Sequence, residues 1–310
     1  MSRIPRSEAE LLAAADRDHP PPVFIIGLHR SGTTFLYATL RSLFPVTCVT
    51  AYRVLHYPEL LSLAASHRAR QAHRELAERF RASGQTDRKI DAIHLSPELL
   101  EEYAFVLARE TGHLKLCAQS ADVFEELLTK LCALEPGHTP LLKNPYDTGQ
   151  VPWIAQRFPR AKFVFIRREP LHVLNSQLKA AETNAGPNAY QDMLLAGFAL
   201  GRTVIRGQRL LMRLVGAPRY RRILVKLLAA DFRRQTAGYA RSWEALPDSR
   251  RCELRYEELV EDPPRALQPV GELLGLPLLA GYETIQPRPR AVRLLPEVEA
   301  YAGTPGFPAC

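Results

Sequence analysis

The apolar residues of this chain gather, within its first 180 positions, into short runs without polar alternation. The runs lie at residues 23–26, 140–143 and 162–166, and the first reads Val-Phe-Ile-Ile. Runs of this length and composition are typical of strands buried on both faces of a parallel sheet. Helical spacing follows two of them, at residues 35–42 and 171–179. The order of elements therefore predicts an α/β fold, with a central parallel sheet flanked by helices.

Helical periodicity predicts further helices between these strands and before them. Their expected positions are residues 7–16, 59–81 (an amphipathic pair), 96–109, 121–134 and 151–157. The helix at 96–109 has start signals, because Ser96 suits the N-cap and Pro97 suits the first helical position. Gly112 is its stop signal. Residues 45–57 follow neither period, so we expect a turn and a short extended or irregular piece there.

A glycine-bounded loop, Gly-Leu-His-Arg-Ser-Gly-Thr-Thr, follows the first strand at residues 27–34. A strand, such a loop and a helix N-terminus form a cradle for anions, since backbone N–H groups and the helix dipole point into it. The spacing matches the nucleotide P-loop, except that Thr33 occupies the position of the lysine that reaches the β- and γ-phosphates. This argues against ATP or GTP. Arg30 offers a planar, permanently charged group instead. The alternative is a strand–turn–helix whose glycines serve no ligand.

Three strand ends are expected to meet at one edge of the sheet, because ligands of parallel sheets lie at the carboxyl ends of the strands. These ends are residues 27–34, 143–147 and 167–170. Arg168 opens the sequence Arg-Glu-Pro-Leu-His-Val-Leu-Asn-Ser. Ser176 then falls in the second turn of the following helix, where its hydroxyl and Arg168 could share an anion. Two anion sites suggest a nucleotide with phosphates at both ends of its ribose. The alternative for this pair is a salt bridge at the helix start and a solvated serine.

The composition is that of a globular chain long enough for a large core, with 310 residues of which 46% are hydrophobic and 24% charged. Its 41 basic and 33 acidic residues give a net charge of +8, which suits nucleic acid, acidic lipid or a polyphosphorylated nucleotide. The five cysteines are scattered without a Cys-x-x-Cys pair, which favours reduced thiols in a cytoplasmic protein over disulfides or structural zinc. The N-terminus does not match a secretory signal, and no stretch has the roughly 18 apolar residues of a membrane span.

Taken in order, four motifs resemble those of the sulfotransferases that use 3′-phosphoadenosine 5′-phosphosulfate (PAPS), in particular the bacterial branch. They are the loop at 27–34, Lys-Asn-Pro at 143–145, the pattern Arg-x-Pro-x5-Ser at 168–176, and the segment 255–263 with the leucine-rich helix after it. The resemblance implies a three-layer architecture like that of P-loop nucleotide hydrolases. It also implies transfer of a sulfuryl group from PAPS to a hydroxyl or amine of a small-molecule, lipid or glycan acceptor.

The resemblance also implies roles for individual residues. Loop residues would bind the 5′-phosphosulfate, Arg168 with Ser176 would bind the 3′-phosphate, and Lys143 would lie near the bridging oxygen. The loop residues are His29, Arg30, Ser31, Gly32, Thr33 and Thr34. In-line transfer leaves charge on the departing phosphate, which cations and N–H groups offset, so no metal is required. The sequence also holds no His/Cys cluster with ligand spacing.

The general base is the open part of this interpretation. A hydroxyl acceptor needs a carboxylate or a histidine within hydrogen-bond reach. The region where many relatives carry a glutamate, at residues 50–57 of this chain, has no carboxylate. Four residues are candidates: Glu102, Asp147, His56 and His29. The alternatives are an exposed helix charge for Glu102 and a helix N-cap for Asp147.

We expect one domain over residues 1–310. Its nucleotide-binding core is expected at about 20–180 and 250–278, and its acceptor-side helical insertions at about 47–135 and 181–237. Residues 190–232 alternate leucine with arginine in a helix pair broken near 216–218. This pair either covers the acceptor site or rests on an acidic membrane, or it packs on the sheet with a solvated arginine face. In the C-terminal tail, Arg288, Arg290 and Arg293 either add contacts to the 3′-phosphate or are solvated.

Two other classes of function compete with this interpretation. A P-loop phosphotransferase or nucleotide hydrolase needs a cradle lysine and a strand-end aspartate for Mg²⁺, whereas Thr33 replaces the lysine, and Lys143 and Arg168 stand at strand ends. A non-catalytic polyanion- or nucleotide-binding protein would use the +8 charge for nucleic acid. The basic residues lack the interleaved aromatics of single-strand readers, and no helix-turn-helix or zinc module occurs. We therefore expect no nucleic-acid partner.

Overall fold

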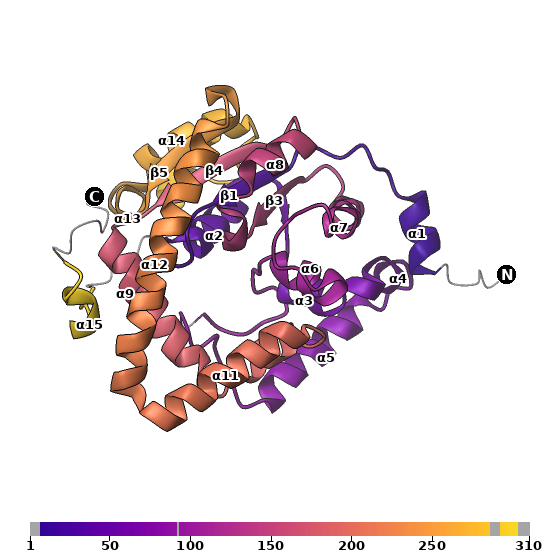
Figure 1. Ribbon diagram of the computed structural model, residues 1–310. Coiled ribbons are helices and arrows are strands. Elements are labelled where there is room, and N and C mark those ends of the chain that lie inside the picture. The colour runs from indigo at the N-terminus through magenta and orange to yellow at the C-terminus, as the bar shows by residue number, and fades with distance from the viewer. Residues whose placement is uncertain (1–6, 92, 286–291, 303–310) are drawn as a thin grey trace.

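The computed structural model describes residues 7–91, 93–285 and 292–302. At its centre lies a five-stranded sheet in the order β2-β3-β1-β4-β5, and every neighbouring pair is parallel (Figure 1). The strands are β1 (Val23–Ile26), β2 (Val46–Cys48), β3 (Thr139–Lys143), β4 (Lys162–Arg167) and β5 (Arg251–Arg255). The three strands expected from the apolar runs form the middle of this sheet, and the predicted α/β class is confirmed.

The side chains of β1 alternate between two hydrophobic cores, one on each face of the sheet. Val23 and Ile25 pack in a core with α2 (Thr33–Leu43), α13 (Tyr256–Glu261) and α14 (Pro263–Leu274). Phe24 and Ile26 pack in the other core, which includes residues of α6 (Ala104–Thr111), α7 (Ala121–Leu134) and α8 (Val151–Arg157). Burial on both faces explains why this strand has no polar alternation.

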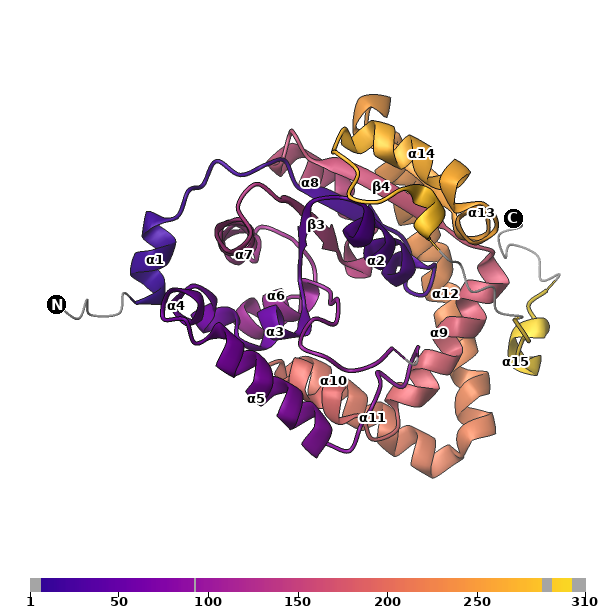
Figure 2. The same cartoon turned by 180° about the vertical axis from the view of Figure 1, so that it is seen from behind.

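The remaining helices extend the second face and one side of the sheet. They are α1 (Glu8–Ala14), α3 (Ala51–Leu55), α4 (Leu60–Ala65), α5 (Ala69–Ala82), α9 (Pro170–Asn184), α10 (Ala189–Leu194), α11 (Ala199–Val215), α12 (Ala217–Glu244) and α15 (Pro296–Glu299). Short 3₁₀ turns lie at Tyr57–Glu59, Pro145–Asp147, Asp248–Arg250 and Tyr282–Thr284. In both Figure 1 and Figure 2, α9, α12 and α11 form an arm that starts at the sheet and returns beside α5.

The predicted break in the basic helix pair is confirmed. Helices α11 and α12 meet at Gly216, whose φ of 77° lies in the region that favours glycine. Pro218 then occupies the first turn of α12. The corner between the two helices lies at the lower edge of the molecule in Figures 1 and 2, away from the sheet.

The predicted helix at 96–109 is wrong in its first half. The helix begins only at Ala104, as α6. Residues 97–101 instead pair with the segment after β2: Ala51 donates its N–H to the Leu99 carbonyl, and Glu101 donates to the Val49 carbonyl. Thr50 forms an antiparallel bridge with Leu100. These long-range bonds outweigh the local helix-start signals, and they turn Glu102 toward the end of the sheet.

Residues 45–57 are also more regular than expected, since they contain β2 and α3. Thr50 caps α3 by accepting a hydrogen bond from the N–H of Arg53 at 3.3 Å. Cys48, Cys117, Cys132 and Cys252 are free thiols, and Cys310 lies outside the described residues. Within the described ranges, no helix combines the length and the apolar character that crossing a membrane requires.

Candidate active site

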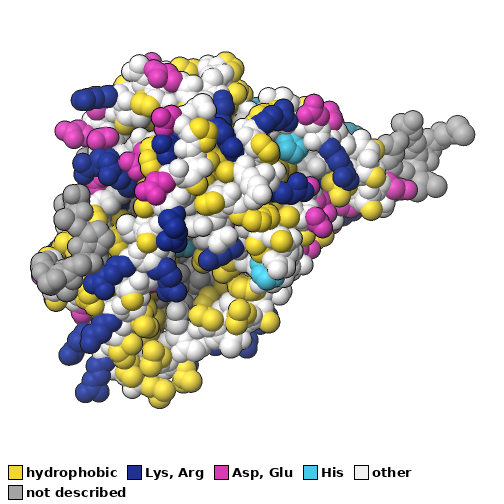
Figure 3. All heavy atoms as spheres, turned by 45° about the horizontal axis from the view of Figure 1, so that its top comes forward, with side chains coloured by type: hydrophobic (Ala, Val, Ile, Leu, Met, Phe, Trp, Pro, Cys, Tyr) yellow, Lys and Arg dark blue, Asp and Glu magenta, His cyan; other side chains and the backbone are white. Residues whose placement is uncertain are grey.

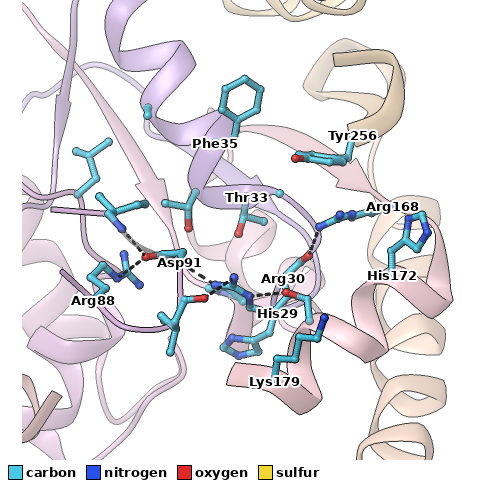
Figure 4. A pocket seen from close by; sticks show the side chains of 18 of the residues that line it. His29, Arg30, Thr33, Phe35, Arg88, Asp91, Arg168, His172, Lys179 and Tyr256 are labelled. Carbon is cyan, nitrogen blue, oxygen red and sulfur yellow. Dashed lines mark hydrogen bonds and ion pairs between the residues drawn. The ribbon is translucent and has the colours of Figure 1, made fainter. Parts of the chain in front are cut away.

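A cavity of about 850 Å³ opens at the carboxyl edge of the sheet. Its walls come from the loop after β1, the segment 88–102, the start of α9 and Tyr256 at the end of β5 (Figure 4). As expected, the carboxyl ends of β1, β3 and β4 lie together, because these three strands are neighbours in the sheet. The cavity is therefore where sequence reasoning placed the ligand.

Two glycines of the loop after β1 stand where a larger residue would collide with its neighbours. A Cβ on Gly27 would lie 2.8 Å from the Ile166 carbonyl oxygen, so β4 approaches the loop too closely for a side chain there. Gly32 has φ 98°, and a Cβ on it would lie 2.2 Å from the ring of Tyr256. Arg30 itself has a positive φ of 72°, a conformation that costs about 1–3 kcal/mol in a residue other than glycine. Strain at this position is typical of a functional loop.

The loop residues fall into two groups by what they touch. Ser31 is buried, and its hydroxyl donates to the Leu28 carbonyl at 2.8 Å, so this side chain holds the turn and does not line the cavity. His29, Arg30, Gly32, Thr33 and Thr34 do line it. No side chain caps the N-terminus of α2, which begins at Thr33. Its first-turn N–H groups are therefore available to an anion.

Lys143, the last residue of β3, is not among the residues that line the cavity, but both of its side-chain partners, Thr34 and Glu102, are. Its side chain is 1% exposed, and its ammonium donates to the Thr34 hydroxyl at 3.0 Å and contacts a Glu102 oxygen at 3.1 Å. Burial by itself would raise the pKa of Glu102, but Lys143 beside it outweighs this effect and holds that pKa below its ordinary value. Burial lowers the pKa of His29, so this imidazole is neutral at pH 7.

Arg30 and Arg168 both line the cavity, and Figure 4 shows them side by side at the loop after β1 and the end of β4. The Arg30 guanidinium donates to the Ser176 hydroxyl at 3.0 Å and to the Ile90 carbonyl at 3.1 Å. The guanidinium carbon of Arg168 lies 4.3 Å from the centre of the Tyr256 ring. Its buried Nε has no hydrogen-bond partner among the described residues. A buried donor without a partner beside a second cation fits a bound anion.

Sequence reasoning missed a set of charged residues that holds the segment 88–101 against Arg30. Asp91 lies 3.7 Å from both Arg30 and Arg88, and Arg88 lies 3.6 Å from the buried Glu101. Glu101 in turn accepts a hydrogen bond from the Tyr190 hydroxyl at 2.6 Å. These residues lie in a connection without periodicity, so no sequence signal pointed to them. Tyr256 did have a signal, because it directly follows a strand end inside the motif at 255–263.

Two of the candidate bases lie away from the cavity. Asp147 is fully buried and accepts hydrogen bonds from the Leu116 N–H at 2.9 Å, the Asn144 amide at 2.7 Å and the Tyr103 hydroxyl. Burial raises the pKa of Asp147 to about 7. His56 contacts Glu59 at 2.8 Å at the end of α3. Neither residue is among those that line the cavity, whereas Glu102 and His29 are.

The remaining candidates for ligand binding are the arginines of the C-terminal tail and groups that could hold a metal ion. Arg293 lines the cavity, and its carbonyl accepts from the Asn175 amide and the Lys179 ammonium, each at 3.2 Å. Arg288 and Arg290 lie outside the described residues. In the part of the chain that the structure describes, no group of three or more His, Cys, Asp or Glu residues is arranged to hold a metal ion.

A sequence model of the sulfotransferase family matches residues 21–280. This region makes up most of the 310 residues and includes all five strands and the loop after β1. The chain therefore belongs to the sulfotransferase family, as the four motifs predicted, and its class of reaction is sulfuryl transfer. No curated protein sequence matches the chain.

Solved structures of two bacterial sulfotransferases are similar to this fold. Sulfotransferase STF9 from Mycobacterium avium is 14% identical, with a TM-score of 0.56 over 96% of this chain and 71% of that one. Sulfotransferase STF1 from Mycobacterium tuberculosis is 17% identical, with a TM-score of 0.58 over 89% of this chain and 72% of that one. At such identities the likeness concerns the fold alone, and it confirms the three-layer architecture.

Proposed function

We propose that this protein transfers a sulfuryl group from PAPS to a hydroxyl or amine of a small-molecule, lipid or glycan acceptor. One observation carries the proposal. Two places at one cavity attract anions: the uncapped N-terminus of α2, where Lys143 contacts Thr34 from behind the cavity wall, and the pair Arg30 and Arg168. PAPS has anionic groups at both its 5′ and 3′ positions, which match these two places.

The residues divide the work of binding between them. At the 5′ end, the N–H groups of the first turn of α2, Thr34 and Lys143 would hold the phosphosulfate and offset the charge that grows on the leaving phosphate. At the 3′ end, Arg168 and Ser176 would bind the phosphate. Arg30, which the motif assigns to the 5′-phosphosulfate, would instead join them, because its guanidinium donates to the Ser176 hydroxyl. The contact with the Tyr256 ring limits the orientations open to the Arg168 guanidinium, which also donates to the Arg30 carbonyl at 3.4 Å.

We further propose Glu102 as the general base. It lines the cavity, its side chain is 12% exposed, and it contacts Lys143. A carboxylate placed there would take the proton of an acceptor hydroxyl as that oxygen attacks the sulfur, while Lys143 stabilises the departing oxygen. The wall beside Glu102 includes Ile93, Leu99 and Leu100. An acceptor with an apolar part beside its hydroxyl or amine suits this wall.

A nucleotide kinase or hydrolase is the weaker proposal. Such an enzyme needs a carboxylate at a strand end for Mg²⁺. The carboxylate that follows β3 in the sequence is Asp147, and three donors within the protein already occupy its oxygens. Thr33 stands at the position of the P-loop lysine. Both features oppose a triphosphate bound with magnesium.

Isothermal titration tests the donor. Adenosine 3′,5′-bisphosphate should bind without magnesium, and adenosine 5′-phosphate should bind more weakly because it leaves Arg168 and Ser176 without a phosphate. Arg168→Met should weaken the bisphosphate about 10- to 100-fold, the range for a charged hydrogen-bond partner. Arg167→Met is the matched control. Arg167 precedes Arg168 in the sequence, but it pairs with Glu253 and does not line this cavity. Magnesium-dependent binding of ATP in preference to the bisphosphate would refute the proposal. A screen of acceptors with labelled PAPS would then identify the second substrate.

A further inference from the structure

Helix α11 contacts the rest of the protein through very little of its surface. Ile205 is its single buried residue out of 17. Leu200, Val204, Leu211 and Leu214 follow a spacing of four, seven and three residues, which places them on one stripe of the helix. Their exposed fractions are 66%, 52%, 37% and 74%. A soluble helix normally buries such a stripe against the rest of the protein.

The apolar stripe continues across the corner onto α12. Ile223 and Leu227 are 44% and 64% exposed. With Leu210, these residues account for seven of the ten large hydrophobic side chains that are exposed in the described part of the chain. Figure 3 shows hydrophobic side chains gathered at the lower end of the molecule, with basic side chains beside them. We call the exposed surface of α11 and the first half of α12 the corner surface.

The corner surface also holds the whole net charge of the protein. Residues 193–230 contain seven arginines and one lysine and no aspartate or glutamate, so their charge of +8 equals that of the entire chain. The rest of the chain is electrically balanced. Of these eight cations, Arg209 and Arg221 pair with carboxylates at 3.5 and 3.4 Å, and the other six make no ion pair with described residues. Arg206 and Arg213 flank Leu210 on adjacent turns.

We propose that the corner surface docks on a membrane that contains anionic lipids, with α11 lying in the plane of the interface. Its leucines would enter the boundary between headgroups and acyl chains, and its arginines would contact lipid phosphates. The position of the corner at an edge of the molecule, away from the sheet (Figures 1 and 2), lets it reach a flat surface without rearrangement. This inference does not depend on the identity of the sulfuryl donor or acceptor.

The charge of the corner surface, together with its apolar stripe, favours an anionic membrane over a second copy of the chain or nucleic acid. In a symmetric dimer through the corner surface, two segments of charge +8 would face each other without any acidic residue from either one, which is unfavourable. Nucleic acid would satisfy the charge but would leave the leucines without an apolar partner. An anionic lipid surface satisfies both the charge and the apolar stripe.

Co-sedimentation with vesicles tests the proposal. The full chain should bind vesicles of phosphatidylcholine with phosphatidylglycerol, bind pure phosphatidylcholine far more weakly, and dissociate as salt is raised. The triple variant Arg206→Glu, Arg213→Glu and Arg222→Glu should bind about 100-fold more weakly, because one basic residue near an anionic surface contributes roughly fivefold. Its matched control, Arg17→Glu, Arg160→Glu and Arg265→Glu, changes the net charge equally at exposed sites outside the corner surface. It should keep most of the binding.

A second set of variants tests the contribution of the exposed leucines to vesicle binding. Replacing Leu200, Leu214 and Leu227 with glutamine should weaken vesicle binding by roughly tenfold per leucine. Leu278→Gln with Leu279→Gln changes exposed leucines elsewhere and should have no effect. The proposal is overturned if the wild-type chain stays in the supernatant with anionic vesicles at low salt. It is overturned equally if each control loses as much binding as its test variant. A dimer in sedimentation velocity that the leucine triple dissolves, without vesicle binding, would assign the surface to a second copy instead.

Discussion

Lys143 and Glu102 contact each other at 3.1 Å, and we propose that this contact links donor binding to acceptor activation. An ammonium has three N–H groups, and Thr34 and Glu102 accept from two of them. Within the described chain, the third remains for an oxygen of a bound anion. An anion that draws charge from Lys143 weakens its hold on Glu102, so the carboxylate becomes a better proton acceptor when the donor is in place. The pair can therefore delay acceptor activation until the donor has bound.

The pH dependence of turnover should identify the base. The pKa of Glu102 is held below its ordinary value by Lys143, so Glu102 is ionised at neutral pH and accepts protons until the pH falls below that range. The acidic limb of kcat/KM should therefore lie below the ordinary range of a glutamate pKa. Asp147 has a pKa raised to about 7. An acidic limb centred near pH 7 would point to a different base from Glu102.

Substitution of the two carboxylates should separate chemistry from stability. Glu102→Gln should lower kcat by about 10²–10⁴ and leave the affinity for adenosine 3′,5′-bisphosphate nearly unchanged. Asp147→Asn should instead cost about 1–3 kcal/mol of unfolding free energy, because an amide cannot accept from all three donors that surround this side chain. Rates with the acceptor from the screen and denaturant unfolding measure the two effects. Normal turnover in both variants would remove both as bases.

At the residue scale, the sequence placed the cations of the site well and their carboxylate partners less well. Arg30 and Arg168 follow predicted strands and Lys143 ends one, and the carboxyl ends of neighbouring parallel strands share an edge. Asp91 reaches Arg30 from a connection that follows no period, so only long-range packing determines its position. Ser31 shows another limit of the sequence. Its place in the motif predicts a ligand-binding side chain, whereas its hydroxyl donates to the Leu28 carbonyl within the turn.

At the scale of elements, the loop after β1 and the start of α13 act as one unit through Gly32 and Tyr256. A side chain at residue 32 would displace the Tyr256 ring, and that ring supports Arg168. The loop that would bind the 5′ end and the arginine that would bind the 3′ end are thus joined by one aromatic contact.

Alanine substitution of two glycines should reveal this link. Gly32→Ala and Gly137→Ala both place a side chain at positive φ, with values of 98° and 81°, but a Cβ at Gly137 would meet nothing within 4 Å. We expect both variants to lose about 1–2 kcal/mol of stability from backbone strain. Only Gly32→Ala should also weaken adenosine 3′,5′-bisphosphate, by tenfold or more in titration calorimetry. Equal affinities in the two variants would contradict the role given to Tyr256.

Among the elements, those with a strong local pattern were predicted and those set by distant contacts were not. The apolar runs located β1, β3 and β4, and the leucine and arginine pattern located α11 and α12. The segment 96–103 carried the signals of a helix start, yet its backbone bonds to residues 49–52, far from it in sequence. Local propensity is worth a few tenths of a kcal/mol per residue, so several such bonds together with burial of Leu99 and Leu100 override it.

At the scale of the whole molecule, one hydrophobic core joins the sheet to both helical insertions. It contains Phe24, Leu142 and Phe163 from the sheet, Leu76 and Phe124 from the first insertion, and Tyr190 and Leu194 from the second. We therefore propose that the chain folds as one domain, because this core takes side chains from the sheet and from both insertions.

Calorimetry should find a single unfolding transition. The calorimetric and van't Hoff enthalpies should agree, as they do for one cooperative unit. Adenosine 3′,5′-bisphosphate at about 100 times its Kd should stabilise the whole transition by about 2.7 kcal/mol. A separate low-temperature transition that the ligand does not shift would show that an insertion unfolds independently.

The place of β1 at the centre of the sheet has a consequence for synthesis of the chain. This strand is made well before its partners, which are residues 141–143 on one side and 162–165 on the other. At a synthesis rate of about 5–20 residues per second, β1 must wait on the order of 10 s until both neighbouring strands have been made. We expect ribosome-bound chains to stay sensitive to protease until β4 has emerged, and to need a chaperone over Val23–Ile26 meanwhile. Protection of chains that end near residue 135 would contradict this order of assembly.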